Sequence, residues 1–115
     1  MKTYGTAYIT QPTGHDFSQI LDFCSEIKFV STGYEQGNPF KTFEKSLADF
    51  IPEEDVLVPV GSTNVNFMLG VFVERLRSEK KCEFVNVAIY HDHAYRIETI
   101  GFEGVLERKN EWDED

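Results

Sequence analysis

Residues 56–64 have the sequence VLVPVGSTN, in which an apolar run is followed by four small residues. An apolar run of this length is typical of a strand that is buried on both faces, as in a parallel sheet. Glycine, serine, threonine and asparagine are residues that turn a chain and cap the helix that follows. The segment therefore predicts a central strand that leads directly into a helix.

An earlier segment has the same order of strand, turn and helix. Residues 3–10 alternate as in a strand, and QPTG at 11–14 ends the pattern. Asp16 is then a candidate helix cap, with Gln19 three residues later as in a capping box. Because the apolar residues at 17, 20, 21, 23 and 24 share one helical face, we predict a short amphipathic α-helix here.

A second and a third unit follow. Residues 27–30 form a short predicted strand. Asn38 and Pro39 favour a helix start, because asparagine caps a helix and proline has no N–H to lose at the first helical position. Pro52 ends that helix. After the central strand, the third helix is expected from Asn64 to about Lys80.

The C-terminal part of the pattern is a predicted β-hairpin. Residues 84–90 and 95–100 both alternate, and a short polar loop from His91 to Ala94 separates them. The predicted order is β-α-β-α-β-α-β-β, which favours a Rossmann-like α/β fold: a single three-layer sandwich with a mostly parallel sheet and a C-terminal antiparallel hairpin. We expect one α/β domain over residues 1–101 and an acidic, mobile C-terminal tail over residues 102–115.

The charge of the chain restricts its partners. It has 20 acidic residues against 11 lysines and arginines, for a net charge of −9. Such a surface repels phosphate backbones, so the composition disfavours nucleic-acid binding. The acidity either keeps the domain soluble or docks on a basic surface of a partner protein. Because residues 67–73 are too few to span a bilayer and the first residues lack a signal-peptide pattern, we expect no membrane association and a cytoplasmic location.

Each predicted parallel strand ends in small polar residues. In an open parallel sheet, ligands bind beyond the carboxyl ends of the strands, where small residues let a ligand approach the backbone. The candidate ligand-binding residues are Thr10, Thr13, Gly14, Ser31, Thr32, Gly33, Gly61, Ser62, Thr63 and Asn64. The same residue types would also serve only to turn the chain and cap helices. The lysine of a P-loop and the Gly-rich dinucleotide fingerprint are both missing.

Residues that could carry catalysis or bind a metal lack the partners that such chemistry needs. His91 and His93 are two residues apart, but a metal site needs a third or fourth ligand. Ser62 follows a strand without the G-x-S-x-G pattern of a nucleophile elbow. Cys24 and Cys82 lie in apolar patterns that favour packing. We therefore predict no catalytic residue, no metal and no cofactor, and a binding protein rather than an enzyme.

Three residues are candidates for contact with another protein. The apolar residues of the third helix cover more than one face, which favours a central helix or one that packs against a second copy of the chain. Phe67 and Val71 lie on this helix and are candidate interface residues of a homo-oligomer. Trp112, the only tryptophan, lies among acids and either anchors a partner protein or has no binding role, in which case it packs back on the domain or stays in solvent.

Residues 52–100 resemble a layout found in small uncharacterised tailed-phage α/β proteins. The layout consists of an acidic turn at 53–55, the apolar strand with its glycine and serine, a very apolar helix, and a hairpin formed by VNVAIY and YRIETI. It contains no functional motif. The resemblance implies a viral accessory protein that is made in a bacterial cytoplasm and binds a host or defence component.

The leading interpretation is a non-enzymatic binding protein, a viral accessory factor that engages a host or defence protein through an acidic surface. The alternative is a small-molecule or nucleotide-binding domain that sequesters its ligand at the C-terminal ends of the parallel strands. An enzyme acting on nucleotides ranks third, because acid and base candidates are missing.

Overall fold

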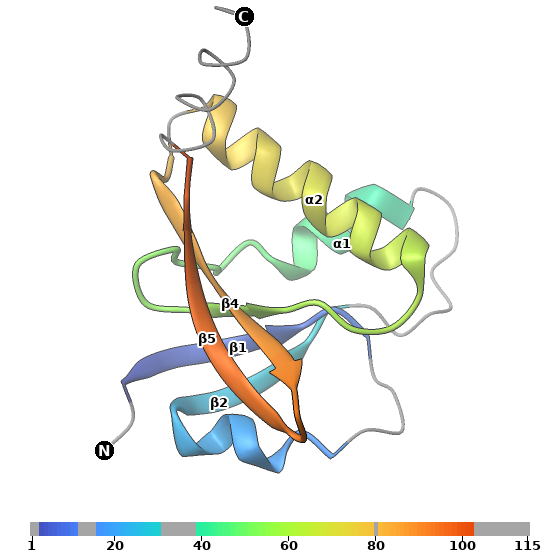
Figure 1. Cartoon of the computed structure of the whole chain (residues 1–115). Coiled ribbons are helices and arrows are strands. Elements are labelled where there is room, and N and C mark those ends of the chain that lie inside the picture. The colour runs from blue at the N-terminus through green and yellow to red at the C-terminus, as the bar shows by residue number, and fades with distance from the viewer. Residues whose placement is uncertain (1–2, 12–15, 31–38, 80, 103–115) are drawn as a thin grey trace, which may run out of the picture.

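The structure is a computed structural model that describes residues 3–11, 16–30, 39–79 and 81–102. Its elements are β1 (Tyr4–Ile9), the 3-10 helix η1 (Ser18–Asp22), β2 (Cys24–Phe29), α1 (Pro39–Ser46), β3 (Val56–Val58), α2 (Thr63–Ser78), β4 (Phe84–His91) and β5 (Ala94–Gly101). All five strands form one sheet in the order β2-β1-β3-β4-β5 (Figure 1). The first four strands are parallel, and β5 pairs antiparallel with β4. The predicted α/β class and mixed sheet are confirmed.

β1 lies between the two strands that follow it in the sequence. Ile9 of β1 is opposite Phe29 of β2 on one side and Val58 of β3 on the other. The connection that leaves β1 leads to β2, whereas the connection that leaves β3 leads to β4 on the other side of the sheet. The direction of the connections therefore changes between β1 and β3, which is where open α/β sheets most often hold a ligand.

The first predicted α-helix is wrong, so the order β-α-β-α-β-α-β-β is not confirmed. The chain between β1 and β2 has the 3-10 helix η1, and Cys24, expected in the helix, is the first residue of β2. Phe17, Ile20 and Phe23 are spaced by three residues, which matches the three-residue turn of a 3-10 helix. This spacing buries Phe17 and Ile20 against the sheet and leaves Leu21 40% exposed.

α1 is shorter than the sequence pattern suggests. It ends at Ser46, whereas the pattern places its end at Pro52. The residues after it are held by tertiary contacts instead: Phe50 packs edge-on against Tyr8 of β1, with ring centroids 5.6 Å apart. The backbone N–H of Ile51 donates to the Asp55 carboxylate at 2.8 Å. Such contacts outweigh the helical propensity of residues 47–51.

α2 matches its prediction more closely. It starts at Thr63, and Ser62 caps it by accepting a hydrogen bond from the backbone N–H of Val65 at 3.3 Å. The helix buries Leu69 and Phe72 and carries Arg75 and Arg77 in its last turn, where cations suit the negative end of the helix dipole. In the described part of the chain, no helix is both long and apolar enough to cross a membrane.

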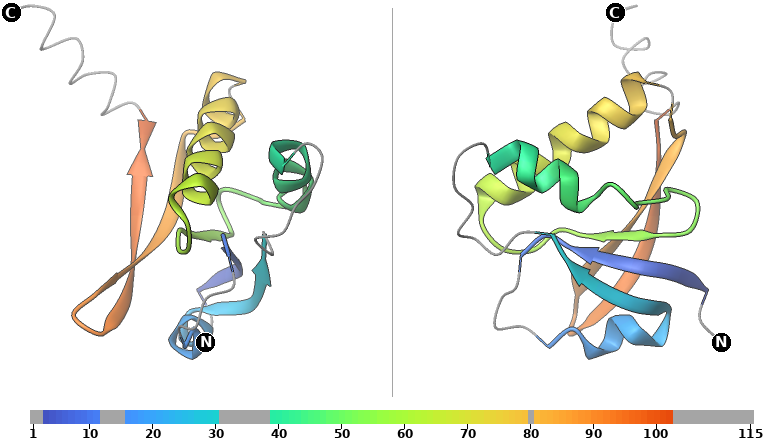
Figure 2. Two further views of the ribbon diagram at one scale, coloured as in Figure 1. Left: turned by 90° about the vertical axis from the view of Figure 1, so that its right-hand side faces the viewer. Right: turned by 180° about the vertical axis from the view of Figure 1, so that it is seen from behind.

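Two apolar clusters lie on opposite faces of the sheet. Tyr8 and Leu57 pack in the cluster that contains residues of α1 and α2, whereas their neighbours Ile9 and Val58 pack in the cluster on the other face. Figure 2 shows α1 and α2 on one face of the sheet and η1 on the other. On that second face the sheet packs against the single short helix η1, through Phe17 and Ile20 among others. Among the described elements, the two faces of the predicted three-layer sandwich are therefore covered unequally: α1 and α2 lie on one face and η1 lies on the other.

The hairpin is tighter than predicted. β4 continues to His91 and β5 starts at Ala94, so the turn consists of Asp92 and His93 rather than four loop residues. Both turn residues have positive φ, 52° and 66°, as in the type I′ turn that suits the twist of a hairpin. Behind the turn, the rings of Tyr90 and Tyr95 lie opposite each other with centroids 4.9 Å apart.

Candidate functional site

The carboxyl ends of β1, β2 and β3 meet at one edge of the sheet, which we call the carboxyl edge. The described candidate ligand residues at this edge are Thr10, Gly61, Ser62, Thr63 and Asn64. The other five candidates, Thr13, Gly14, Ser31, Thr32 and Gly33, lie outside the described residues. The parallel pairing of β1 with both neighbours agrees with the expected arrangement of this edge.

Thr10 is fully buried, and its hydroxyl fastens β1 to the connection between β3 and α2. The Thr10 Oγ1 accepts a hydrogen bond from the backbone N–H of Val60 at 2.7 Å. It also lies within hydrogen-bond distance of the Val60 carbonyl and of Asn66 Oδ1, the latter at 3.1 Å. Because these partners surround the hydroxyl, Thr10 has a structural role at this edge.

Gly61 and Ser62 form a tight turn against Gln11. Gly61 has φ 95°, and a Cβ at this position would lie 2.2 Å from Gln11 Oε1. The backbone N–H of Ser62 donates to the same Gln11 oxygen at 2.8 Å, while the Ser62 hydroxyl caps α2. Thr63 and Asn64 are exposed in the first turn of α2. The described half of the predicted ligand site thus uses its central polar groups to close the turn and cap the helix.

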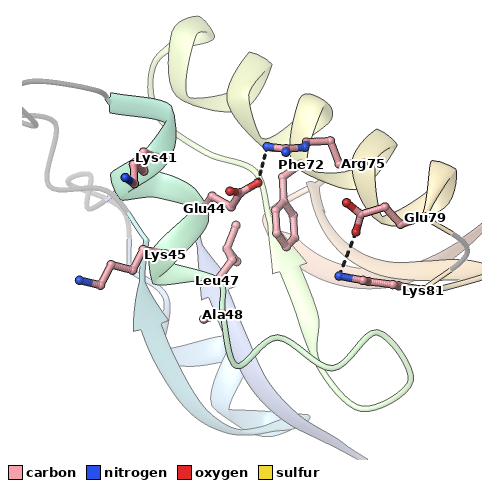
Figure 3. Close-up of a pocket in the computed structure, with 9 residues that line it drawn as sticks. All are labelled: Lys41, Glu44, Lys45, Leu47, Ala48, Phe72, Arg75, Glu79 and Lys81. Carbon is pink, nitrogen blue, oxygen red and sulfur yellow. Dashed lines mark hydrogen bonds and ion pairs between the residues drawn. The ribbon is translucent and has the colours of Figure 1, made fainter.

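The sequence pattern did not indicate a second site, a pocket between α1 and α2. It has a volume of about 490 Å³ and is lined by Lys41, Glu44, Lys45, Leu47, Ala48, Phe72, Arg75, Glu79 and Lys81 (Figure 3). Leu47, which directly follows α1, and Phe72 of α2 are buried and lie next to each other in its middle. Most of the other lining residues are charged, so the pocket has an apolar floor and a charged rim.

Basic residues outnumber acidic ones around this pocket by four to two. Arg75 Nη1 pairs with Glu44 Oε2 at 2.6 Å, which joins the two helices, and the Arg75 guanidinium lies 5.6 Å from the centre of the Phe40 ring. Lys81 Nζ pairs with Glu79 Oε2 at 2.9 Å, and this hydrogen bond lowers the pKa of Glu79. The pocket is therefore a basic region on a protein whose net charge is −9.

Acidic residues gather at the opposite, amino edge of the parallel strands. Asp22 precedes β2, residues 53–55 precede β3, and Glu83 precedes β4. Since these strands are parallel and adjacent through β1, their amino ends lie at the same edge of the sheet. Asp22, Glu53, Glu54 and Glu83 are exposed, whereas Asp55 is buried. We call Asp22, Glu53, Glu54, Asp55 and Glu83 the acidic amino edge.

Asp55 fixes the loop before β3, residues 51–55, to the sheet, and we call this segment the acidic loop. Its carboxylate accepts hydrogen bonds from the backbone N–H of Thr6 at 2.9 Å and from that of Ile51 at 2.8 Å. The backbone N–H of Gly5 donates to the Glu54 carbonyl at 2.8 Å, and a Cβ on Gly5 would lie 2.7 Å from Asp55 Oδ1. The glycine therefore allows the loop to approach β1 closely.

Negatively charged carboxylates contribute to the raised pKa values of two neighbouring side chains. Burial raises the pKa of the Tyr8 hydroxyl, and the negative charges of Asp55, Asp49 and Glu26 raise it further. Burial also raises the pKa of the Cys82 thiol, with a contribution from Glu53. Asp55 and Glu53 of the acidic amino edge thus each contribute to one raised pKa, whereas Asp49 and Glu26 do not belong to that edge.

The remaining described candidates do not line the pocket between α1 and α2. Phe67 is 73% exposed and Val71 is 36% exposed on α2, so both are accessible to a partner, and self-association through them stays a prediction. Trp112 lies outside the described residues. His91 and His93 lie at the tip of the hairpin, and in the described ranges no three potential metal ligands come together.

Comparisons with protein-family models, with curated proteins and with solved structures gave no match to this chain. The resemblance of residues 52–100 to tailed-phage proteins therefore stays a prediction.

Proposed function

We propose that this chain is a non-enzymatic protein-binding domain whose acidic amino edge docks on a basic surface of a partner protein. The observation that carries the proposal is the placement of exposed carboxylates before three of the four parallel strands, which the sheet brings to one edge. Like charges gathered in this way repel one another, so they favour a partner that supplies the opposite charge.

Two further features support binding over a role in solubility alone. Ile51 lies within the acidic loop and is 45% exposed, so the loop offers one bulky apolar side chain among carboxylates. Interfaces typically combine such an apolar anchor with a charged surround. The bonds of Asp55 to Thr6 and Ile51 hold the loop in place before any partner arrives, which lowers the entropic cost of association.

The biological setting in this proposal follows the sequence resemblance. The chain would act as a viral accessory factor in a bacterial cytoplasm and bind a host or defence protein. Electrostatic attraction to a basic partner would accelerate the encounter and weaken as salt is raised. A partner that normally binds nucleic acid has a suitable basic surface, and the acidic amino edge would compete for it.

The test neutralises the acidic amino edge. The triple variant Glu53→Gln, Glu54→Gln and Glu83→Gln removes three exposed charges without changing side-chain length. Immobilised full-length protein is exposed to a bacterial lysate, and the bound proteins are eluted with a salt gradient and identified by mass spectrometry. We expect basic proteins that bind the native chain and elute as salt rises, and we expect their recovery from the triple variant to fall about tenfold or more.

A charge-matched variant provides the control. Glu74→Gln, Asp92→Asn and Glu98→Gln remove the same number of exposed charges from α2, the hairpin turn and β5. This variant should still capture the same basic proteins. Equal capture by both triple variants would contradict docking through the acidic amino edge, as would bound proteins that resist elution by salt.

The small-molecule alternative has one observation in its favour, the change of connection direction between β1 and β3. Against it, Thr10, Gln11 and Ser62 use their side chains within the turn. A nucleotide-binding domain gains thermal stability that grows with nucleotide concentration, whereas a protein-binding domain does not respond. A thermal-shift series with nucleotides therefore separates the two functions.

A further inference from the structure

The pocket between α1 and α2 concentrates positive charge on an acidic molecule. Four of the seven lysines and arginines in the described residues line it: Lys41, Lys45, Arg75 and Lys81. Glu44 and Glu79 each pair with one of these cations, so a surplus of two positive charges remains at the rim. This local charge favours an anionic occupant.

The arrangement of the rim favours an elongated occupant rather than one small anion. Figure 3 shows Lys41 and Lys45 on the α1 side and Lys81 on the far side, with Leu47 and Phe72 between them. Charges this widely distributed match several carboxylates along a peptide. The buried apolar floor matches one bulky apolar side chain on the same peptide.

The chain itself contains a segment with this chemistry. Residues 111–115 have the sequence EWDED, which is four carboxylates around Trp112. These residues lie outside the described part, and the described chain ends at Phe102, which is bonded to a residue near one end of the rim. The backbone N–H of Phe102 donates to the Glu83 carbonyl at 3.1 Å, two residues from Lys81 of the rim.

Phe102 also packs against the same apolar cluster that contains Leu47 and Phe72. The ten residues from 103 to 112 can extend over about 33 Å. That reach exceeds the distance from Phe102 to Lys81 of the rim, because Phe102 is bonded to Glu83, which is only two positions from Lys81. Trp112 can therefore arrive at the pocket of its own chain without any change in the described elements.

We propose that residues 111–115 bind in the pocket between α1 and α2 of the same chain, with Trp112 on the apolar floor and the carboxylates beside the basic rim. The segment then occupies the basic region of the molecule and leaves the acidic amino edge open. This inference is independent of the proposed function, because it concerns the opposite charge and a different set of residues.

Trp112 is the only tryptophan, so fluorescence excited at a wavelength that the five tyrosines do not absorb reports on this residue alone. We expect an emission maximum at shorter wavelength than that of free N-acetyltryptophanamide. We also expect the acrylamide quenching constant to be about half that of the free compound or lower, since a docked indole is shielded from the quencher. Raising the salt concentration should shift both values toward the free compound, because the attraction is screened.

The variant that tests the site is Lys45→Glu with Lys81→Glu, which reverses one charge on each side of the rim. Its quenching constant should rise about twofold as repulsion displaces the acidic segment. The control is Arg77→Glu with Arg96→Glu, which changes the net charge equally at residues that do not line the pocket. The control should keep the native quenching constant, and circular dichroism verifies that both variants are folded.

Three results would overturn the proposal. The first is native emission and quenching equal to those of free N-acetyltryptophanamide. The second is a shielded Trp112 that responds in the same way to the pocket variant and to the control. The third is shielding that disappears on dilution of the protein, which would assign the segment to the pocket of a second copy instead of its own chain.

Discussion

The two edges of the parallel sheet use polar residues in opposite ways. At the carboxyl edge, the side chains of Thr10, Gln11 and Ser62 bond to nearby backbone groups. At the amino edge, Asp55 alone is buried, and the other four acids are exposed. Small hydroxyl and amide groups beside a turn are satisfied locally, whereas most carboxylates before a strand face solvent. The accessibility of a polar group therefore distinguishes a binding surface from a structural turn better than its residue type does.

The largest expected effect is a loss of stability when Asp55, the buried residue of the acidic amino edge, is changed. Asp55→Asn should lower the free energy of unfolding by about 2–3 kcal/mol, because an uncharged amide can accept from Thr6 or Ile51 but presents an NH₂ group to the other N–H. Urea unfolding followed by circular dichroism measures the loss. Glu54→Gln, which alters an exposed neighbour, should stay within about 0.5 kcal/mol of the native chain. Similar stability of the two variants would show that Asp55 does not hold the loop.

The next effect tests whether the carboxyl edge is structural. Thr10→Val keeps the side-chain shape and removes the hydroxyl, which leaves the backbone N–H of Val60 without its acceptor. We expect a loss of about 1–3 kcal/mol in the free energy of unfolding, again from urea unfolding. Thr63→Val, at an exposed position on the same edge, is the matched control and should have little effect. If Thr10→Val leaves the free energy of unfolding unchanged, the hydroxyl is not needed for the fold and the carboxyl edge is again a candidate ligand site.

The smallest expected effect tests whether Ser62 caps α2. Ser62→Ala removes the acceptor for the N–H of Val65 and should cost about 1 kcal/mol of stability. Ser62→Asp keeps an acceptor and places a negative charge at the positive end of α2, so it should restore the native value. If Asp is no better than Ala in urea unfolding, Ser62 does not act as a cap.

Much of the sheet could be predicted from the sequence, because its signals are local. The apolar run at 56–60 and the alternation in 84–90 and 95–100 depend on neighbouring residues, and the structure has strands there. The segment before β2 was harder, since Phe17 and Ile20 share a face in an α-helix and in a 3-10 helix alike. Cys24, which the helical pattern includes, instead pairs with Tyr4 as the first residue of β2.

The α1–α2 pocket could not be predicted in the same way. The pair of Glu44 with Arg75 joins residues that are 31 positions apart, and it depends on how the two helices pack. No local period in the sequence contains that information. The acidic amino edge is easier to predict from the sequence. Once the strands are assigned, the acids at residues 22, 53–55 and 83 are seen to precede strands.

The unequal cover of the sheet has a consequence for how the molecule opens. Among the described elements, α1 and α2 cover one face of the sheet. The other face is covered by the five residues of η1 and by the contacts of Phe17 with Phe29 and Tyr95. A single short helical turn has few backbone bonds of its own, so its detachment costs much less than unfolding the domain. Among the described elements, we therefore expect water to reach the interior first beneath η1 and only later beneath α2.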